Sequence, residues 1–291
     1  MSIELLNPNE FERFRGFIYR ESGIRIGDGK ISLLSNRIRR RLKACGLSDF
    51  GDYFRLLTSS QSSDELQYFL DAVTTNETFF FRTDSHFEWL RSEFLPGVAA
   101  QHRRGERGSS LRFWSAACAS GAEPWSIAFC LADNQFRLGN WTLNIMGTDI
   151  SEHEIEKARE AVYPTRMIES LSASHQRRYF ATAGENQLAV RPRFRQWVEF
   201  ATHNLMLPLD QPQFDCIFLC NVLIYFDAAS KQTVLGHVTD SLAPGGYLVT
   251  GPSEGVFDLL HGYDKVAPMV YRKLPGGEHS DSVDKQQECP R

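Results

Sequence analysis

Apolar residues recur at helical spacing through the first quarter of the chain, and glycines separate the segments. This pattern predicts four amphipathic helices, the second over residues 31–44. Ser62 followed by Glu65 is the signature of a capping box at the start of the fourth helix. Residues 1–75 are therefore predicted to form an all-helical domain. The positions on its buried faces are Phe11, Phe14, Ile18, Leu34, Ile38, Leu42, Phe50, Phe54, Leu57, Leu66, Phe69, Leu70 and Val73.

From about residue 76 onward, short apolar runs with strand character alternate with helical patterns. Such alternation predicts a parallel sheet with right-handed crossovers, a Rossmann-like α/β architecture. Residues 186–199 alternate apolar and polar side chains, which predicts a small antiparallel excursion. The polar tail over residues 275–291 is expected to be disordered. Strands are expected at 111–117, 141–150, 197–202, 214–220, 247–251 and about 269–274, and helices at 123–134, 151–161 and 228–242.

Composition and charge narrow the class of protein. The 291 residues carry a net charge of −4, which argues against general nucleic-acid binding. No apolar run approaches the roughly 18 residues of a membrane helix, and the N-terminus lacks the pattern of a secretory signal. The six cysteines form no C-x-x-C pair and the eight histidines show no metal spacing, so we expect reduced thiols, no metal and a cytoplasmic location. A soluble enzyme or a signalling domain remains.

The loop after the first expected strand is built of small residues, Ala117 to Ala122, followed by Glu123. Small residues let the backbone come close to a ligand. The segment is not a G-x-G-x-x-G motif, since it holds only Gly121, so a nucleoside without phosphates fits better than a pyrophosphate. A plain strand-to-helix turn is the alternative.

The second expected strand ends in Asp149, 28 residues after Gly121. A carboxylate at this point of an α/β sheet can accept hydrogen bonds from both ribose hydroxyls. Alternatively, Asp149 caps the next helix.

Two further segments combine apolar and polar groups. The strand over residues 214–220 leads into Asn221 and Tyr225, which predicts either a site wall or an amphipathic core tyrosine. The segment 74–82 holds three consecutive phenylalanines beside Asn76, Thr78 and Arg82. It must be packed, as a site segment or as a domain linker.

Six motifs occur in an order that carries a resemblance to a known family: TTNETFFFR (74–82), WSAACASGAEPWSIA (114–128), GTDI (147–150), HNL (203–205), CNVLIYFD (220–227) and LAPGGYLVTGPSE (242–254). From about residue 10 to 274 the chain resembles the CheR-type chemotaxis receptor methyltransferases. The resemblance implies a helical domain at 1–75 and a Rossmann-like S-adenosylmethionine (SAM) domain at 76–274. It also implies a small antiparallel β-subdomain inserted at about 180–200. The implied activity is methyl transfer from SAM to glutamate side chains of a chemoreceptor, a methyl-accepting chemotaxis protein, with S-adenosylhomocysteine as product.

The resemblance also implies roles for individual residues. Arg82 and Tyr225 would face the reacting carboxylate, and Asp149 would hold the ribose. Asn204 and Leu205 would lie near the adenine. The residues implied to bind SAM are Asn76, Thr78, Arg82, Glu123, Asp149, Asn204, Leu205, Cys220 and Asn221.

The chain departs from the family pattern at one position that bears on the cofactor. The family usually reads C-R-N where this chain has Leu219, Cys220 and Asn221. Loss of the charge-assisted bonds of that Arg could weaken SAM binding by up to about a few kcal/mol. This departure leaves an alternative, a catalytically weak SAM-binding relative that acts as a signalling module.

Five cations lie within the seven residues from Arg37 to Lys43. By composition this run is either a solvated helix face or a nucleic-acid-binding patch. A nucleic-acid-binding patch would also fit a SAM enzyme that acts on a small molecule or RNA. The resemblance implies instead that this helix meets the acidic helical bundle of the receptor. The loop from Ala181 to Gln187 is short, so we expect no tether to a receptor tail peptide. We further expect a monomer that neither binds nucleic acid nor inserts into a membrane.

Overall fold

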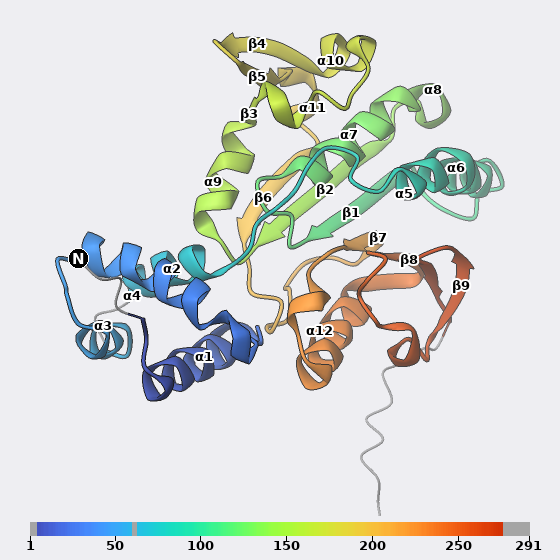
Figure 1. The fold of residues 1–291 in the computed structure, drawn as a ribbon. Helices are drawn as coiled ribbons and strands as arrows, with labels where there is room; N and C mark the ends of the chain where they lie inside the picture. The colour runs from blue at the N-terminus through green and yellow to red at the C-terminus, as the bar shows by residue number, and fades with distance from the viewer. Residues whose placement is uncertain (1–4, 60–62, 276–291) are drawn as a thin grey trace, which may run out of the picture.

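The computed structural model describes residues 5–59 and 63–275 and places a helical unit beside a large mixed sheet (Figure 1). Within the helical unit, the rings of Phe14, Tyr53 and Phe69 pack against one another at centroid distances of 6.1 to 6.3 Å. The expected apolar faces thus close on a common core. The unit consists of α1 (Pro8–Ser22), η1 (Asp28–Lys30), α2 (Ile31–Ala44), α3 (Phe50–Leu57) and α4 (Ser63–Val73).

Glu65, expected to form a capping box with Ser62, binds side chains of two other helices. Its carboxylate accepts hydrogen bonds from Arg41 Nε and Nη2, at 3.0 and 2.7 Å, and from the Tyr53 hydroxyl at 2.6 Å. A guanidinium fork binds a carboxylate more strongly than a single backbone N–H does. Burial raises the pKa of Glu65, but these bonds outweigh it and the net pKa is lowered. Glu65 therefore joins α4 to α2 and α3, and Ser62 lies outside the described residues.

The large sheet has seven strands in the order β6-β2-β1-β7-β8-β10-β9. The first five are parallel, and β10 runs antiparallel to both of its neighbours. The chain order reverses at β1, so the crevice beyond the ends of β1 and β7 is where a ligand is expected. The Rossmann-like fold class is confirmed. The strands are β1 (Ser110–Ala116), β2 (Thr142–Asp149), β6 (Val198–Thr202), β7 (Phe214–Leu219), β8 (Leu242–Thr250), β9 (Tyr263–Ala267) and β10 (Val270–Lys273).

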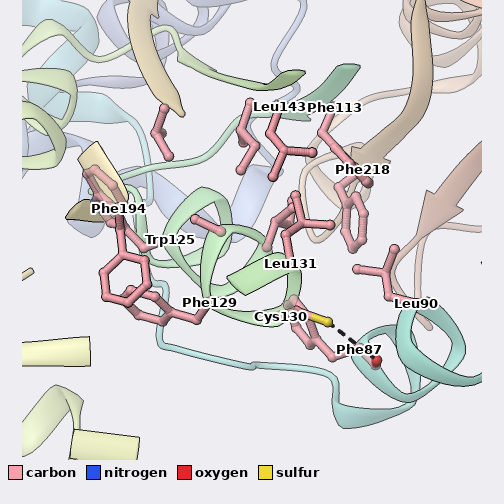
Figure 2. Close-up of a cluster of buried hydrophobic side chains, with 14 of the residues drawn as sticks. Phe87, Leu90, Phe113, Trp125, Phe129, Cys130, Leu131, Leu143, Phe194 and Phe218 are labelled. Carbon is pink, nitrogen blue, oxygen red and sulfur yellow. Dashed lines mark hydrogen bonds between the residues drawn. The ribbon is translucent and has the colours of Figure 1, made fainter. Parts of the chain in front are cut away.

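Both faces of this sheet are buried. Strand alternation sends Phe113 and Phe218 to one face, where α5, η2, α6 and α7 cover them, and Figure 2 shows this cluster. Trp114 and Ile217 point to the other face, which α12 covers. The covering elements are α5 (Asp84–Trp89), η2 (Leu90–Phe94), α6 (Leu95–Arg103), α7 (Ala122–Asp133), α8 (Gln135–Leu138) and α12 (Ala228–Ser241). The sequence patterns predict no helix between Arg82 and the first strand, whereas the structure has α5, η2 and α6 there.

The small antiparallel sheet differs from the expected region of about 180–200. Its order is β3-β5-β4, and β3 lies well before that region. The strand expected at 197–202 is present as Val198–Thr202 and pairs in parallel with β2, so the antiparallel excursion expected over 186–199 ends before it. Its Phe200 ring packs closely over Gly147, where a Cβ would lie 2.7 Å from the ring. The elements here are α9 (Glu152–Glu160), β3 (Val162–Pro164), η3 (Thr165–Met167), α10 (Ala173–Tyr179), β4 (Phe180–Gly184), β5 (Gln187–Val190) and α11 (Pro192–Arg195). Residues 276–291 of the expected tail lie outside the described residues.

Candidate active site

A pocket lies where the helical unit meets the carboxyl ends of the strands. Its walls come from the loops after β1, β2, β6 and β7, from residues 73–83 between α4 and α5, and from residues 22–37 of the helical unit. All ten residues singled out from the sequence line this one pocket: Asn76, Thr78, Arg82, Glu123, Asp149, Asn204, Leu205, Cys220, Asn221 and Tyr225.

The loop after β1 is a tight turn that uses up its own backbone donors. Ala117, Ala119 and Gly121 have φ of 62°, 47° and 86°, and an added Cβ at Gly121 would lie 2.8 Å from the Ala158 methyl group. The N–H groups of Cys118, Ala119 and Gly121 donate to Thr148 O, Asp149 Oδ2 and Cys118 O at 2.8 to 3.0 Å. These N–H groups are therefore not free to cradle a phosphate, in agreement with a nucleoside that lacks one.

Asp149 ends β2 with its carboxylate only 6% exposed. Its two oxygens accept the N–H groups of Ser151 and Ala119, at 2.9 and 2.8 Å. Burial raises its pKa to about 6, and these two bonds oppose the shift. Ser151, rather than Asp149, is the cap of α9. Each carboxylate oxygen has a second lone pair, so Asp149 can still accept ligand hydroxyls from the pocket.

Glu123 stands in the pocket without a bonded cation. Its carboxylate accepts the Ser115 hydroxyl at 2.7 Å, and the Cys220 thiol also lies within hydrogen-bonding reach. Burial raises the pKa of Glu123 to about 7, although these bonds and the more distant charge of Arg82 oppose it. Cys220 Sγ also lies 3.9 Å from His86 Nδ1, and burial raises the pKa of this thiol well above its ordinary value. Cys220 thus offers Glu123 a thiol rather than a cation.

The segment between α4 and α5 is both a linker packed into the core and part of the pocket wall. Phe80 is buried and packs edge-on against Tyr163 and Phe180, at 5.0 and 5.2 Å between ring centroids. Phe79 is 42% exposed beneath the Arg82 guanidinium, which donates to the Glu77 carbonyl at 2.7 Å. The buried ring of Phe80 therefore anchors this linker, and the anchored linker keeps its polar side chains at the pocket.

The loop after β7 brings Asn221 and Tyr225 to the pocket through the short turn η4 (Leu223–Tyr225). Asn221 has φ of 60°, a conformation that asparagine tolerates better than most residues. The Tyr225 carbonyl accepts the N–H of Arg25 at 2.8 Å, which ties this loop to the helical unit. Tyr225 thus stands at the seam between the two parts of the molecule.

Asn204 has a structural task that the sequence did not indicate. Its Nδ2 donates to the Glu21 carbonyl at 2.6 Å, and its Oδ1 accepts the N–H of Met206 at 3.0 Å. The side-chain amide therefore links the sheet to α1. The neighbouring Leu205 is 7% exposed and supplies an apolar pocket surface.

The sequence reasoning missed several pocket residues. Arg37 had been assigned to the receptor-facing run, but its guanidinium donates to the Val73 carbonyl and to Thr75 Oγ1. His86 and His203 each have a buried Nε2 with no hydrogen-bond partner among residues 5–59 and 63–275. Burial lowers the pKa of His86 to about 4. These histidines do not lie in any metal-binding spacing, so the sequence offered no indication that they line the pocket.

The residues present fit SAM. The pocket combines the Asp149 carboxylate for a ribose, the Glu123 carboxylate for a cationic group and the apolar surface of Leu205 for an adenine ring. The loop N–H groups of Cys118, Ala119 and Gly121 are already paired within the protein and do not offer a phosphate cradle. In the described parts of the chain, no cluster of His, Cys, Asp or Glu could hold a metal ion, and no helix is long and apolar enough to cross a membrane.

The sheet order and this pocket define a SAM-dependent methyltransferase. Two family descriptions match the chain, "CheR methyltransferase, all-alpha domain" over residues 9–74 and "CheR methyltransferase, SAM binding domain" over residues 76–270. The chain belongs to the CheR methyltransferase family.

Named relatives are similar over nearly the whole chain. The chemotaxis protein methyltransferase of Salmonella typhimurium is 36% identical over 272 residues, covering 91% of this chain and 90% of the relative. That of Escherichia coli is 37% identical over 273 residues, covering 91% of each. The chemotaxis protein methyltransferase Cher2 of Pseudomonas putida is 34% identical over 262 residues, covering 88% of this chain and 94% of the relative.

Proposed function

We propose that this enzyme methylates glutamate side chains of a chemoreceptor and that the ten pocket residues bind SAM and align the acceptor. The observation that carries the assignment is that one pocket gathers every residue implied by the family motifs. The relatives' names, chemotaxis protein methyltransferases, support the acceptor class. The alternative of a non-catalytic module rests on Cys220 alone.

The reaction requires little general acid–base catalysis by the protein. When bound, SAM supplies an electrophilic methyl group. A glutamate carboxylate, with a reference pKa of about 4.3, is already ionised near neutral pH and needs no general base. The task of the chain is therefore to align the carboxylate and to remove water from it.

Residues at the pocket seam suit that task. Arg82 can hold one carboxylate oxygen or both through its planar guanidinium. Tyr225 can orient the second oxygen, and its ring lies near enough to Arg37 for the two groups to interact electrostatically. Asp149 would hold the ribose hydroxyls, and Glu123 and Asn221 would face the amino-acid end of SAM.

The receptor-facing surface is smaller than the run of five cations suggested. Arg37 binds the linker and Arg41 binds Glu65, so neither is free for a partner. Arg40 and Lys43 are exposed on the same helix. Arg25 and Lys30 are exposed and line the pocket itself. We propose that these four cations guide the acidic receptor bundle to the pocket, chiefly by raising the association rate.

The remaining partner expectations stay proposals. The β4–β5 hairpin turns through two residues, with Asn186 at φ of 57°, so the region offers no long loop to a tail peptide. We propose a cytoplasmic monomer that docks on its receptor without that tether.

The test is transfer of labelled methyl from SAM to purified receptor, followed by mild base. We expect label that base releases as methanol, which is the behaviour of a carboxyl ester and excludes an RNA product. Arg82→Ala should lower turnover about a hundredfold by removing the acceptor's charge-assisted bonds. Arg137→Ala, at an exposed arginine on α8, is the matched control and should leave turnover unchanged. Equal turnover in both variants would remove Arg82 from the mechanism.

Titration with SAM and S-adenosylhomocysteine separates the enzyme from the non-catalytic module. We expect micromolar binding, which would show that the pocket compensates for Cys220. No binding at millimolar ligand would overturn the proposed function.

A further inference from the structure

Glu254 is a buried carboxylate that lies behind the active-site loop rather than in the pocket. It follows β8 in the segment Gly251 to Glu254 and is 1% exposed. Its Oε1 accepts the backbone N–H of Asn221. Its Oε2 is buried and has no hydrogen-bond partner among residues 5–59 and 63–275. A single hydrogen bond, from the N–H of Asn221, therefore joins this carboxylate to the start of the active-site loop.

A carboxylate in this position is costly unless nearby donors offset its burial. Burial raises the pKa of Glu254, and the nearby N–H groups of residues 221–224 oppose that shift. A buried charge is retained in folded proteins where fixed donors replace water. An apolar side chain would fill the same space and leave the N–H of Asn221 without its acceptor.

Two neighbours adapt to this contact. A Cβ at Gly251 would lie 2.7 Å from Glu254 Oε1 and 3.0 Å from the backbone nitrogen of Asn221, so only glycine leaves room for both. Lys231 Nζ donates to the Glu254 carbonyl at 2.6 Å and holds the backbone of this segment against α12. The carboxylate of Glu254 is therefore bonded to the active-site loop, and its backbone carbonyl is bonded to α12.

The loop that Glu254 holds carries pocket residues. Cys220, Asn221 and Tyr225 all line the pocket, whereas Glu254 does not. The other side of the loop is held by the helical unit, through the N–H of Arg25 and a β-bridge between Ile24 and Phe226. Without Glu254, the sheet side of the loop would lose its main polar attachment.

We propose that Glu254 is a positioning residue, whose carboxylate fixes the backbone of residues 221–224 so that Asn221 and Tyr225 face the pocket. The consequence for methyl transfer rests on the proposed function. The hold on the loop and its effect on cofactor binding do not.

The first experiment compares Glu254→Gln and Glu254→Ala with Asp258→Asn, a matched change of an exposed acid four residues further on. Hydrogen–deuterium exchange reports the amides of residues 221–224 directly. We expect exchange there to accelerate about tenfold in Glu254→Ala, less in Glu254→Gln, and not at all in the control. Titration with S-adenosylhomocysteine should show weaker binding in the same order.

Turnover should depend on how well the loop at residues 221–224 is ordered, rather than on the global stability of the protein. We expect kcat to fall about tenfold or more in Glu254→Ala, since small misplacements of aligning groups reduce rates strongly. The same substitution in a Tyr225→Phe background should lower kcat much less, because both changes act on one element. Unchanged exchange and unchanged cofactor affinity in Glu254→Ala would overturn the proposal.

Gly251→Ala tests the same contact without removing the carboxylate and decides the question if the Glu254 variants do not fold. Its methyl group should push Glu254 and Asn221 apart and reproduce the faster exchange at residues 221–224. Gly108→Ala, where nothing lies within 4 Å of the added methyl, is its control. Wild-type exchange in Gly251→Ala would contradict the proposal. A wild-type enzyme that binds cofactor but methylates no receptor would instead refute only the proposed function.

Discussion

The pocket has two walls of different character. The wall at the strand ends is set by backbone hydrogen bonds and carries the carboxylates of Glu123 and Asp149. The wall from the helical unit and the linker carries the cations of Arg25, Lys30 and Arg37, together with Arg82. The first wall is acidic, while the second is basic and is joined to the sheet by a few hydrogen bonds, such as those from Arg25 N–H to the Tyr225 carbonyl and from Asn204 to the Glu21 carbonyl.

This difference separates the two halves of the reaction. Carboxylates at strand ends suit the hydroxyl and cationic groups of SAM. Cations on the helical side suit an acidic acceptor. We propose that the strand-end wall contributes mainly to SAM binding and the cations of the other wall mainly to the acceptor, so that substitutions in each wall give separable effects.

The largest effect is expected from the strand-end wall at Asp149. Asp149→Ala removes a ligand acceptor and leaves the buried N–H groups of Ala119 and Ser151 unpaired, at a cost of about 1–3 kcal/mol each. We expect S-adenosylhomocysteine binding to weaken at least about a hundredfold and the melting temperature to fall. Calorimetric titration and thermal unfolding measure both. Asp149→Asn, which keeps one acceptor oxygen, should lose less, and equal losses would show that the charge is the only contribution.

Glu123 should give a pH-dependent effect in the same wall. Burial raises the folded-state pKa of Glu123 from its ordinary value of 4.5 to about 7, so the folded state binds this proton more tightly. Wild type therefore loses stability as pH rises from about 4.5 to about 7, by up to about 3 kcal/mol, and Glu123→Gln does not. Urea unfolding across this pH range should show the variant becoming relatively more stable. The exposed Glu185→Gln is the control, and parallel curves for Glu123→Gln and wild type would contradict the assignment.

A substitution of Arg37 tests how much the basic wall contributes to stability and to cofactor binding. Arg37→Ala breaks the bonds to the Val73 carbonyl and Thr75 Oγ1 that join α2 to the linker. We expect a loss of about 1–2 kcal/mol in unfolding free energy and weaker cofactor binding. Arg40→Ala, three residues away and exposed, should change neither quantity. Identical unfolding curves for the two variants would mean that the Arg37 bonds do not stabilise the seam.

The smallest effect on stability is expected on the outer face of α2. Arg40→Glu with Lys43→Glu should change unfolding free energy by less than about 0.5 kcal/mol and leave cofactor affinity intact. Receptor methylation at low salt should slow several-fold, and the difference from wild type should shrink as ionic strength rises. Arg103→Glu with Arg137→Glu, at exposed positions away from the pocket, provides the charge-matched control. A salt-independent defect would argue against electrostatic guidance.

Local pattern was sufficient where a residue's partners are close in sequence. The Ser151 cap, the turn through Gly121 and the acid at the end of β2 all follow from neighbours a few residues apart. Local pattern was insufficient where the partner is distant. It did not show that the Glu65 carboxylate binds Arg41 on another helix, or that the antiparallel sheet ends at Val190 before Val198–Thr202 pairs with β2.

The sequence by itself determined the alternation of elements, the acids at strand ends and the family motifs, because helix periodicity and turn chemistry act over a few residues. Only the tertiary structure decided which cations are free, which strand completes the sheet and what holds the active-site loop. Arg37, Arg41 and Glu254 are alike in the sequence, as charged residues in polar surroundings. Their roles depend on donors and acceptors brought within hydrogen-bond distance by the packing of segments far apart along the chain.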